Sequence, residues 1–203
     1  MADKTYRAIR HDVVRAKQKS NSEEVHHPVE KLEQIDKVLK GSSKLKILEL
    51  FCGCKNLTPT YEKYGRVECY DKKLKTGDSY TIFHKLIGEK KKYNVIDLDP
   101  YGFPNRFFPD IFLLIEHGYL FLTMPKPYVN ILNGITKRHL TCYYGEYNPP
   151  IDVILSKIKD YGLCHWRNTE VVDLIDLGRL WRIALRVDRV KATEYCGVRN
   201  RRD

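Results

Sequence analysis

The chain has 203 residues, with 36 lysines and arginines against 26 aspartates and glutamates, which gives a formal net charge of +10. This length suits one domain or one domain with a small appendage, and 42% hydrophobic residues provide a core. No apolar run approaches the length of about 18 residues that a transmembrane helix needs. The charge excess points to a polyanionic partner such as nucleic acid, and a solvated lysine-rich surface is the simpler alternative.

The N-terminus and the cysteines indicate the compartment. The first residues are polar and charged, unlike a secretory signal, so we expect a cytoplasmic protein without a membrane segment. The six cysteines form no C-x-x-C pair, and several lie in apolar runs. We therefore expect reduced thiols, with no disulfide framework and no metal site. Cys52 and Cys54 are more simply explained as packed small residues than as metal ligands.

Residues 1–44 are predicted to form a basic helical N-terminal extension. A first helix carries Tyr6, Ile9, Val13 and Ala16 on one face, with arginines and lysines around it. Pro28 opens a second helix, whose apolar stripe consists of Leu32, Ile35, Val38 and Leu39.

From residue 45 onward, short apolar runs alternate with helix signals. Strands are predicted at residues 45–51, 67–71, 93–99, 119–124, 163–167 and 180–187. Helices are predicted from Thr58 to Gly65, around residues 80–87, over residues 110–117 with Gly118 as a stop, and from Pro149 to Gly162. This order indicates an α/β fold with an open, mostly parallel, doubly wound sheet. The last two strands, with no helix between them, predict an antiparallel pair at one edge.

Three of the predicted strand ends carry residues suited to binding: Phe51-Cys52-Gly53-Cys54-Lys55-Asn56, Tyr70-Asp71-Lys72 and Asp99-Pro100-Tyr101-Gly102. Ligands of open α/β sheets bind outside the carboxyl ends of the strands, so we expect these segments to converge on one crevice. An acid after the second strand can accept hydrogen bonds from both ribose hydroxyls. The G-x-G-x-x-G and G-x-x-x-x-G-K patterns are absent, which disfavours a dinucleotide cofactor and nucleotide hydrolysis.

These segments resemble the motifs of class I S-adenosylmethionine-dependent methyltransferases. Glu49-Leu50-Phe51-Cys52-Gly53-Cys54 is similar to their first motif, E/D-x-F-x-G-x-G, and Asp71 matches their ribose-binding acid. Gly77-Asp78 is similar to the step whose acid contacts the adenine amine. The string Ile96–Gly102 most resembles the D-L-D-P-F/Y-G signature of the tRNA guanine dimethyltransferase family.

The resemblance spans roughly residues 45–125, with a weaker similarity at Cys142-Tyr143-Tyr144-Gly145. The last residues, 198–203, are basic, and we expect them to form a short, loose tail. The resemblance implies a catalytic domain over residues 45–197. It also implies S-adenosyl-L-methionine as the cofactor, bound by Glu49, Phe51, Cys52, Gly53, Asn56, Asp71, Lys72 and Asp78. The catalytic segment it implies is Asp99, Pro100, Tyr101 and Gly102.

The chemistry of this last segment suits methylation of an exocyclic base amine. The amine is a poor nucleophile because its lone pair is delocalised into the ring. The Asp99 carboxylate, or a carbonyl beside Pro100, can accept the amine protons and localise that lone pair, while the Tyr101 ring stacks on the base. The resemblance therefore implies a nucleic-acid methyltransferase, with guanine in tRNA or another RNA favoured as the target.

Other interpretations of the same residues remain open. The target could be adenine in DNA or RNA, because the D-P-Y core is shared. The chain could be an inactive nucleic-acid-binding subunit, because Lys55 or Asn56 replaces the second glycine of the first motif. A small-molecule or protein methyltransferase is a third alternative. At the level of single residues, D-P-Y-G is also good turn chemistry, and Asp78 could simply cap the following helix.

Overall fold

The computed structural model describes residues 27–100, 102–127 and 137–190. The first expected helix, Tyr101, Cys196 and the C-terminal tail lie outside the described residues. The helices are α2 (Pro28–Leu39), α3 (Thr58–Glu62), α4 (Ser79–Gly88), α5 (Phe108–Ile111), α6 (Lys137–Tyr144) and α7 (Ile151–Cys164). The strands are β1 (Leu45–Leu50), β2 (Gly65–Tyr70), β3 (Tyr93–Leu98), β4 (Ile115–Pro125), β5 (Arg167–Asp176) and β6 (Leu180–Arg189).

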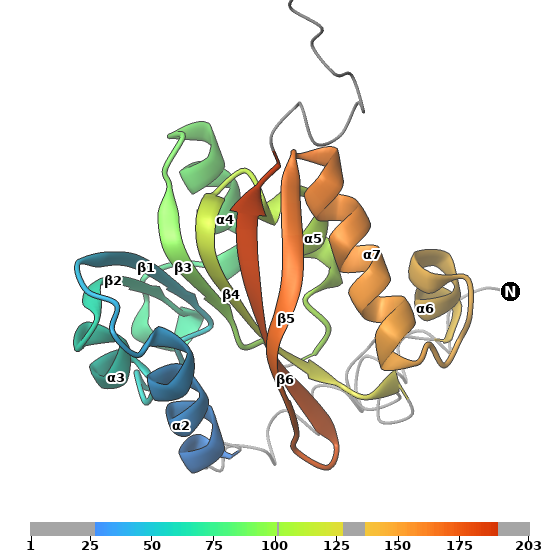
Figure 1. The fold of residues 1–203 in the computed structure, drawn as a ribbon, viewed down its shortest axis with the longest axis horizontal. Coiled ribbons are helices and arrows are strands. Elements are labelled where there is room, and N and C mark those ends of the chain that lie inside the picture. Colours follow the sequence, from blue (N-terminus) through green and yellow to red (C-terminus); the bar gives the residue numbers. More distant parts are fainter. Residues whose placement is uncertain (1–26, 101, 128–136, 191–203) are drawn as a thin grey trace, which may run out of the picture.

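The six described strands form one sheet in the order β2-β1-β3-β4-β6-β5 (Figure 1). The pairings β1–β2, β1–β3 and β3–β4 are parallel, whereas β6 pairs antiparallel with both β4 and β5. The open, mostly parallel sheet with an antiparallel pair at one edge, which the sequence predicts, is therefore confirmed.

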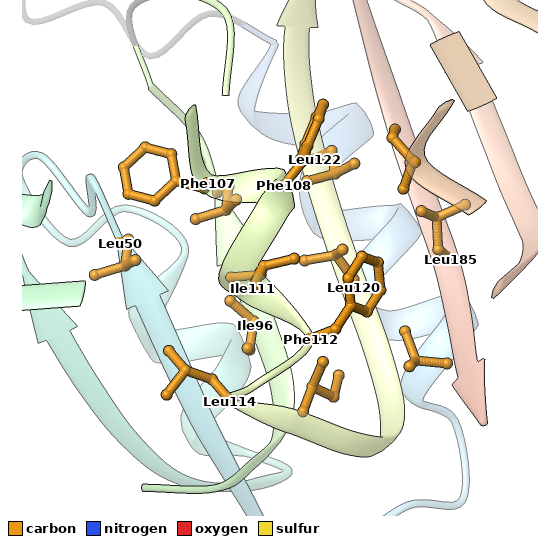
Figure 2. Close-up of a cluster of buried hydrophobic side chains, with 14 of the residues drawn as sticks. Leu50, Ile96, Phe107, Phe108, Ile111, Phe112, Leu114, Leu120, Leu122 and Leu185 are labelled. Carbon is orange, nitrogen blue, oxygen red and sulfur yellow. The ribbon is translucent and has the colours of Figure 1, made fainter. Parts of the chain in front are cut away.

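Helices cover both faces of the sheet, and each face has its own apolar core. The larger core packs β-strand side chains against α4, α5 and α7, and Figure 2 shows its central part, with Ile96 and Leu120 of the sheet near Ile111 and Phe112. The smaller core packs Ile35 and Leu39 of α2 and Tyr61 of α3 against the opposite face. Whether residues 1–44 form a separate unit stays a prediction, but α2 is part of this second core.

Two glycines predicted to end helices instead allow close contacts within the sheet. Gly118 lies inside β4 with a φ of +144°, and a Cβ there would come within 1.8 Å of the Asn94 carbonyl oxygen. Gly65 begins β2, where a Cβ would approach the Leu45 carbonyl oxygen to 2.0 Å. The predicted helix over residues 110–117 is wrong, because Gly118 is a residue of β4 and does not end a helix. Helix α5 ends at Ile111, and β4 has begun by Ile115.

The expected strand at residues 163–167 is also wrong in its position. Helix α7 continues past Gly162 to Cys164, and β5 begins only at Arg167. Gly162 packs closely on the start of this strand, where a Cβ would meet the Arg167 carbonyl oxygen at 2.8 Å. β5 is an edge strand, and its partly exposed apolar residues are interrupted by acids, which obscures the alternation that identifies a strand.

A buried ion pair ties β3 to β6 beneath α3. Both Asp97 and Arg182 are fully buried, and the guanidinium donates from Nη1 to Asp97 Oδ1 at 2.7 Å and from Nη2 to Oδ2 at 2.6 Å. The Tyr61 hydroxyl donates to Asp97 Oδ2 at 2.6 Å, and Arg182 Nη1 also donates to Thr123 Oγ1 at 2.9 Å. Because each charge has a bonded partner, breaking the pair from one side leaves the other charge buried and uncompensated.

We predict that Arg182→Met lowers the free energy of unfolding by about 3–5 kcal/mol, because Asp97 loses its counter-ion without access to water. The measurement is urea denaturation of the purified protein. Arg186→Met on the same strand is the matched control, since Arg186 is half-exposed and pairs with Glu170 and Asp188 at the surface. It should cost less than about 1 kcal/mol. Equal losses in the two variants would contradict this account of the ion pair.

Candidate active site

The sheet has one topological switch point, between β1 and β3. The chain leaves β1 for β2 on one side and then crosses to β3 on the other. Register aligns Leu50 with Tyr70 and with Leu98, so the residues that follow these three positions emerge at the same edge of the sheet. This edge is where open α/β sheets bind ligands. The three predicted segments thus start side by side, as expected.

The turn after β1 is built on left-handed backbone. Phe51, Gly53 and Lys55 have φ values of 68°, 53° and 64°, and the Lys55 amide donates to the Cys52 carbonyl oxygen at 2.7 Å. The second glycine of the first motif is therefore replaced by Lys55, which adopts the left-handed backbone conformation, and not by Asn56. Left-handed backbone is unfavourable for residues with a Cβ, and such strain is concentrated at functional sites. A Cβ on Gly53 would meet nothing within 4 Å, so the space beside this turn is open.

Asp71 connects the turn after β1 to the turn after β2. Its Oδ2 accepts from the Gly53 amide at 3.1 Å, and its Oδ1 accepts from the Lys73 amide at 2.7 Å. Each carboxylate oxygen has two acceptor positions, so both oxygens retain capacity for another donor. The residue is half-buried, and its position beside Gly53 suits a ligand that carries adjacent hydroxyls.

Asp78 caps a helix, which is the structural alternative left open by the sequence. Its Oδ1 accepts from the amides of Tyr80 and Thr81, both at 3.1 Å, at the start of α4. Its Oδ2 pairs with Lys72 Nζ at 2.6 Å, and this bond, together with the cap, lowers the pKa of the Asp78 carboxyl. Lys72 is exposed. Contacts of Asp78 and Lys72 with a cofactor stay a prediction.

Glu49 and Cys52 are buried beside this crevice. The Glu49 side chain is 2% exposed and accepts from Thr58 Oγ1 at 2.6 Å. Burial raises the pKa of Glu49 to about 8; the Thr58 hydrogen bond opposes the shift, and the charges of Asp97 and Asp99 add to it. Burial, with Cys69 as a neighbour, likewise raises the pKa of the Cys52 thiol. Both side chains are buried in the protein, and their contact with a cofactor stays a prediction.

Asp99 is held by Lys31, a residue that no sequence motif indicates. Lys31 of α2 is 3% exposed, and its Nζ donates to Asp99 Oδ2 at 2.6 Å. Within the described part of the chain, Lys31 is the one partner of this carboxylate, and the Asp99 side chain is 23% exposed. The Oδ1 atom therefore remains available as an acceptor at the end of β3. Lys31 and Gln34 lie in phase with the apolar stripe of α2, a pattern that could have indicated their burial but not their partners.

The segment after Asp99 turns sharply. The Gly102 amide donates to the Pro100 carbonyl oxygen at 2.9 Å, and Gly102 has a φ of 133°, a conformation that favours glycine. Further along, the Tyr144 hydroxyl of α6 donates to Asn105 Oδ1. The C-Y-Y-G segment that resembles a family element is therefore tied to the chain just beyond the D-P-Y-G segment.

An aromatic and cationic cluster lies on the α4 side of this segment. The Arg106 guanidinium lies 4.4 Å from the centre of the Tyr80 ring, and Tyr80 packs edge-on against Phe107 at 5.6 Å between centroids. Phe51 also meets Phe107 edge-on, at 5.5 Å. The turn after β1, the start of α4 and the segment after β3 are thus joined by ring contacts.

The five cysteines within residues 27–100, 102–127 and 137–190 are free thiols, and no cluster of potential metal ligands occurs in those ranges. None of the helices described for this chain has the length and apolar character needed to cross a membrane.

No family model and no curated protein sequence matches the chain. Solved structures do resemble it. One is a candidate SAM-dependent methyltransferase of Streptococcus mutans, with a TM-score of 0.53 and 10% identity over 77% of this chain and 48% of that one. Another is Trm5b of Pyrococcus abyssi, with a TM-score of 0.50 and 14% identity over 78% and 48%. A third is Trm1 of Pyrococcus horikoshii in complex with S-adenosyl-L-methionine, with a TM-score of 0.50 and 14% identity over 77% and 47%.

These likenesses show that the chain has the Rossmann-like fold of S-adenosylmethionine-dependent methyltransferases. The chain spans about half the length of each of these three structures.

The raised pKa of Glu49 predicts a pH-dependent stability. The folded-state pKa of about 8 lies above the ordinary value of 4.5, so this contribution to stability is complete below pH 4.5 and is lost as the pH rises through 8. Over this range the free energy of unfolding falls by at most about 1.4 kcal/mol per pH unit. We expect Glu49→Gln, which keeps an acceptor for Thr58, to remove this decline. Urea denaturation of both proteins between pH 5 and 9 measures it, and parallel pH profiles would contradict the prediction.

Proposed function

We propose that the chain binds S-adenosyl-L-methionine at the carboxyl ends of β1, β2 and β3 and methylates an exocyclic amine of a nucleic-acid base. Guanine in RNA is the favoured target, because the string Ile96–Gly102 resembles the tRNA guanine dimethyltransferase signature. The observation that carries the proposal is the position of Asp99: it follows β3 at the switch point, with one carboxylate oxygen fixed by Lys31 and the other available.

The residues present fit the cofactor. Asp71 keeps acceptor capacity for the two ribose hydroxyls and is oriented by the Gly53 and Lys73 amides. The open space beside Gly53 allows a ligand to approach the backbone of the turn. When bound, S-adenosylmethionine supplies an electrophilic methyl group on a sulfonium centre, so the protein's main task is to position the acceptor amine.

Asp99 is proposed to act on the amine. Its available oxygen accepts a hydrogen bond from the amine, which withdraws the nitrogen lone pair from the ring, and the carboxylate then takes the proton released on methylation. Lys31 is a positioning residue: its bond to Oδ2 fixes the carboxylate orientation. Tyr101 lies outside the described residues, and its role in stacking on the base is proposed from the sequence alone.

A nucleic-acid substrate is supported by charge and by the fold. The net charge of +10 favours a polyanionic partner. Exposed lysines surround the proposed crevice at positions 55, 72, 73 and 75. Trm5b and Trm1, whose structures resemble this chain, are tRNA methyltransferases.

We predict that Asp71→Ala weakens S-adenosylmethionine binding by about 10–150-fold, because a charge-assisted pair of hydrogen bonds is lost. Isothermal titration calorimetry measures the affinity. Asp71→Asn keeps one acceptor oxygen and should bind with intermediate affinity. Asp152→Ala, an exposed acid in the first turn of α7, is the control and should bind as the unmodified protein does. Unchanged affinity in Asp71→Ala would place the ribose contact elsewhere.

We predict that Asp99→Ala abolishes methyl transfer while retaining cofactor binding, because its carboxylate serves the amine and not the sulfonium. Asp99→Asn should keep part of the activity, since the amide also offers an acceptor oxygen. Tyr101→Phe should reduce methyl transfer only slightly, because stacking needs the ring and not the hydroxyl. Tyr101→Ala should lose a stacking contact worth about 1–3 kcal/mol. The assay is mass spectrometry of nucleosides digested from RNA and DNA after incubation with labelled cofactor.

The same assay separates the alternatives. A labelled methylguanosine supports the favoured target, and a labelled methyladenine supports the alternative base. Normal methylation by Asp99→Ala would contradict the mechanism. Cofactor binding without labelled nucleosides in either nucleic acid would favour a binding subunit or another substrate.

A further inference from the structure

A basic hollow lies at the opposite end of the sheet from the proposed crevice. Its volume is about 380 Å³, and it is lined at the amino ends of β1, β2 and β3 by Lys46, Arg66, Glu68, Lys90, Lys91, Lys92 and Tyr93. Register aligns Lys46 directly with Arg66, so these two side chains project from neighbouring strands in one row. The three consecutive lysines belong to the connection between α4 and β3, residues 89–92, whose first residue, Glu89, pairs with Lys85 of α4.

Most of these cations have no acidic partner. Lys92 pairs with Glu116 at 3.0 Å and donates to the Leu113 carbonyl oxygen. Within the described part of the chain, no ion pair engages Lys46, Arg66, Lys90 or Lys91. A cluster of unpaired, like charges in a concave site repels itself, and an anion that enters it relieves that repulsion.

The one acid of the hollow is engaged by tyrosines. Glu68 accepts from the Tyr93 hydroxyl at 2.7 Å and lies 3.5 Å from the Tyr70 hydroxyl. Burial and the Glu68 bond raise the pKa of Tyr93, so its hydroxyl remains protonated and keeps donating. The lining therefore holds four unpaired cations against one carboxylate, so the hollow presents an excess of positive charge to a ligand.

We infer that this hollow binds a phosphate group of the nucleic-acid backbone and forms a second contact site for the substrate. The inference rests on the proposed function, because the crevice must hold a base of the same molecule. β2 is the edge strand of the sheet, with Arg66 near its amino end and Lys72 just beyond its carboxyl end. A six-residue strand spans on the order of 20 Å, a distance that a folded RNA covers. The two sites thus lie at the two ends of one edge strand.

The test removes two charges from the hollow without touching the crevice. We expect Lys46→Gln/Lys91→Gln to bind a fluorescent tRNA-sized RNA several-fold more weakly by anisotropy. The slope of log affinity against log salt should become shallower by up to about 2, the amount expected for two lost phosphate contacts. Lys157→Gln/Lys159→Gln on α7 is the matched control, because α7 packs near β5 at the other edge of the sheet. This variant should keep the original affinity and slope.

Each outcome has one meaning for the inference. Equal RNA affinity and salt slope in the hollow variant and the control would overturn it. Titration with inorganic phosphate and with a nucleoside triphosphate distinguishes the source of the phosphate: loss of only this small-anion binding, with RNA binding intact, would also overturn it. S-adenosylmethionine affinity, measured in parallel, should stay unchanged in both variants. A failure of the proposed methylation appears instead as absent nucleoside labelling while the RNA-binding difference persists.

Discussion

The structure depends on a charge balance at the carboxyl ends of β1 and β3. Three carboxylates, Glu49, Asp97 and Asp99, meet two buried cations there, Arg182 and Lys31. Arg182 donates one hydrogen bond to each oxygen of Asp97, and Lys31 binds one oxygen of Asp99. Glu49, which has no cation of its own among these contacts, has its pKa raised to about 8. Burial without a counter-ion therefore keeps Glu49 largely in its protonated, acid form near neutral pH.

This balance connects the packing of α2 to the site. Ile35 and Leu39 bury the apolar stripe of the helix, and Lys31 extends from its first turn to Asp99. The Gln34 side chain donates a hydrogen bond to Asp173 of β5, so α2 contacts the sheet both beside the crevice and at the β5 edge. A helix outside the region of family resemblance thereby orients the carboxylate that the proposed mechanism needs. The proposed mechanism needs one free acceptor oxygen in a fixed position, and the bond from Lys31 to Asp99 Oδ2 leaves Oδ1 in that role.

The sequence predicted the elements whose signals are local. Apolar runs identified the parallel strands, and the motif order placed Asp71 and Asp99 at strand ends that the register then aligned. It could not predict the Lys31–Asp99 contact, because the partners are 68 residues apart and a lysine in a basic segment suggests solvent. Gly118 was misinterpreted because glycine ends helices and also allows close backbone approach, and only the neighbouring Asn94 distinguishes these cases. Lys55 was ambiguous for a similar reason: its left-handed backbone is imposed by the turn.

Hydrogen–deuterium exchange with and without saturating S-adenosylmethionine tests whether the cofactor binds at the carboxyl ends of β1, β2 and β3, because it locates the cofactor on the unmodified chain. We expect slower exchange in three separate segments, residues 51–56, 70–78 and 97–102, since they begin at one edge of the sheet and would be covered by one ligand. The amides of Gly53 and Lys73, both bonded to Asp71, should be among those affected. Protection confined to other regions, such as the α6–α7 segment or the basic hollow, would contradict the account.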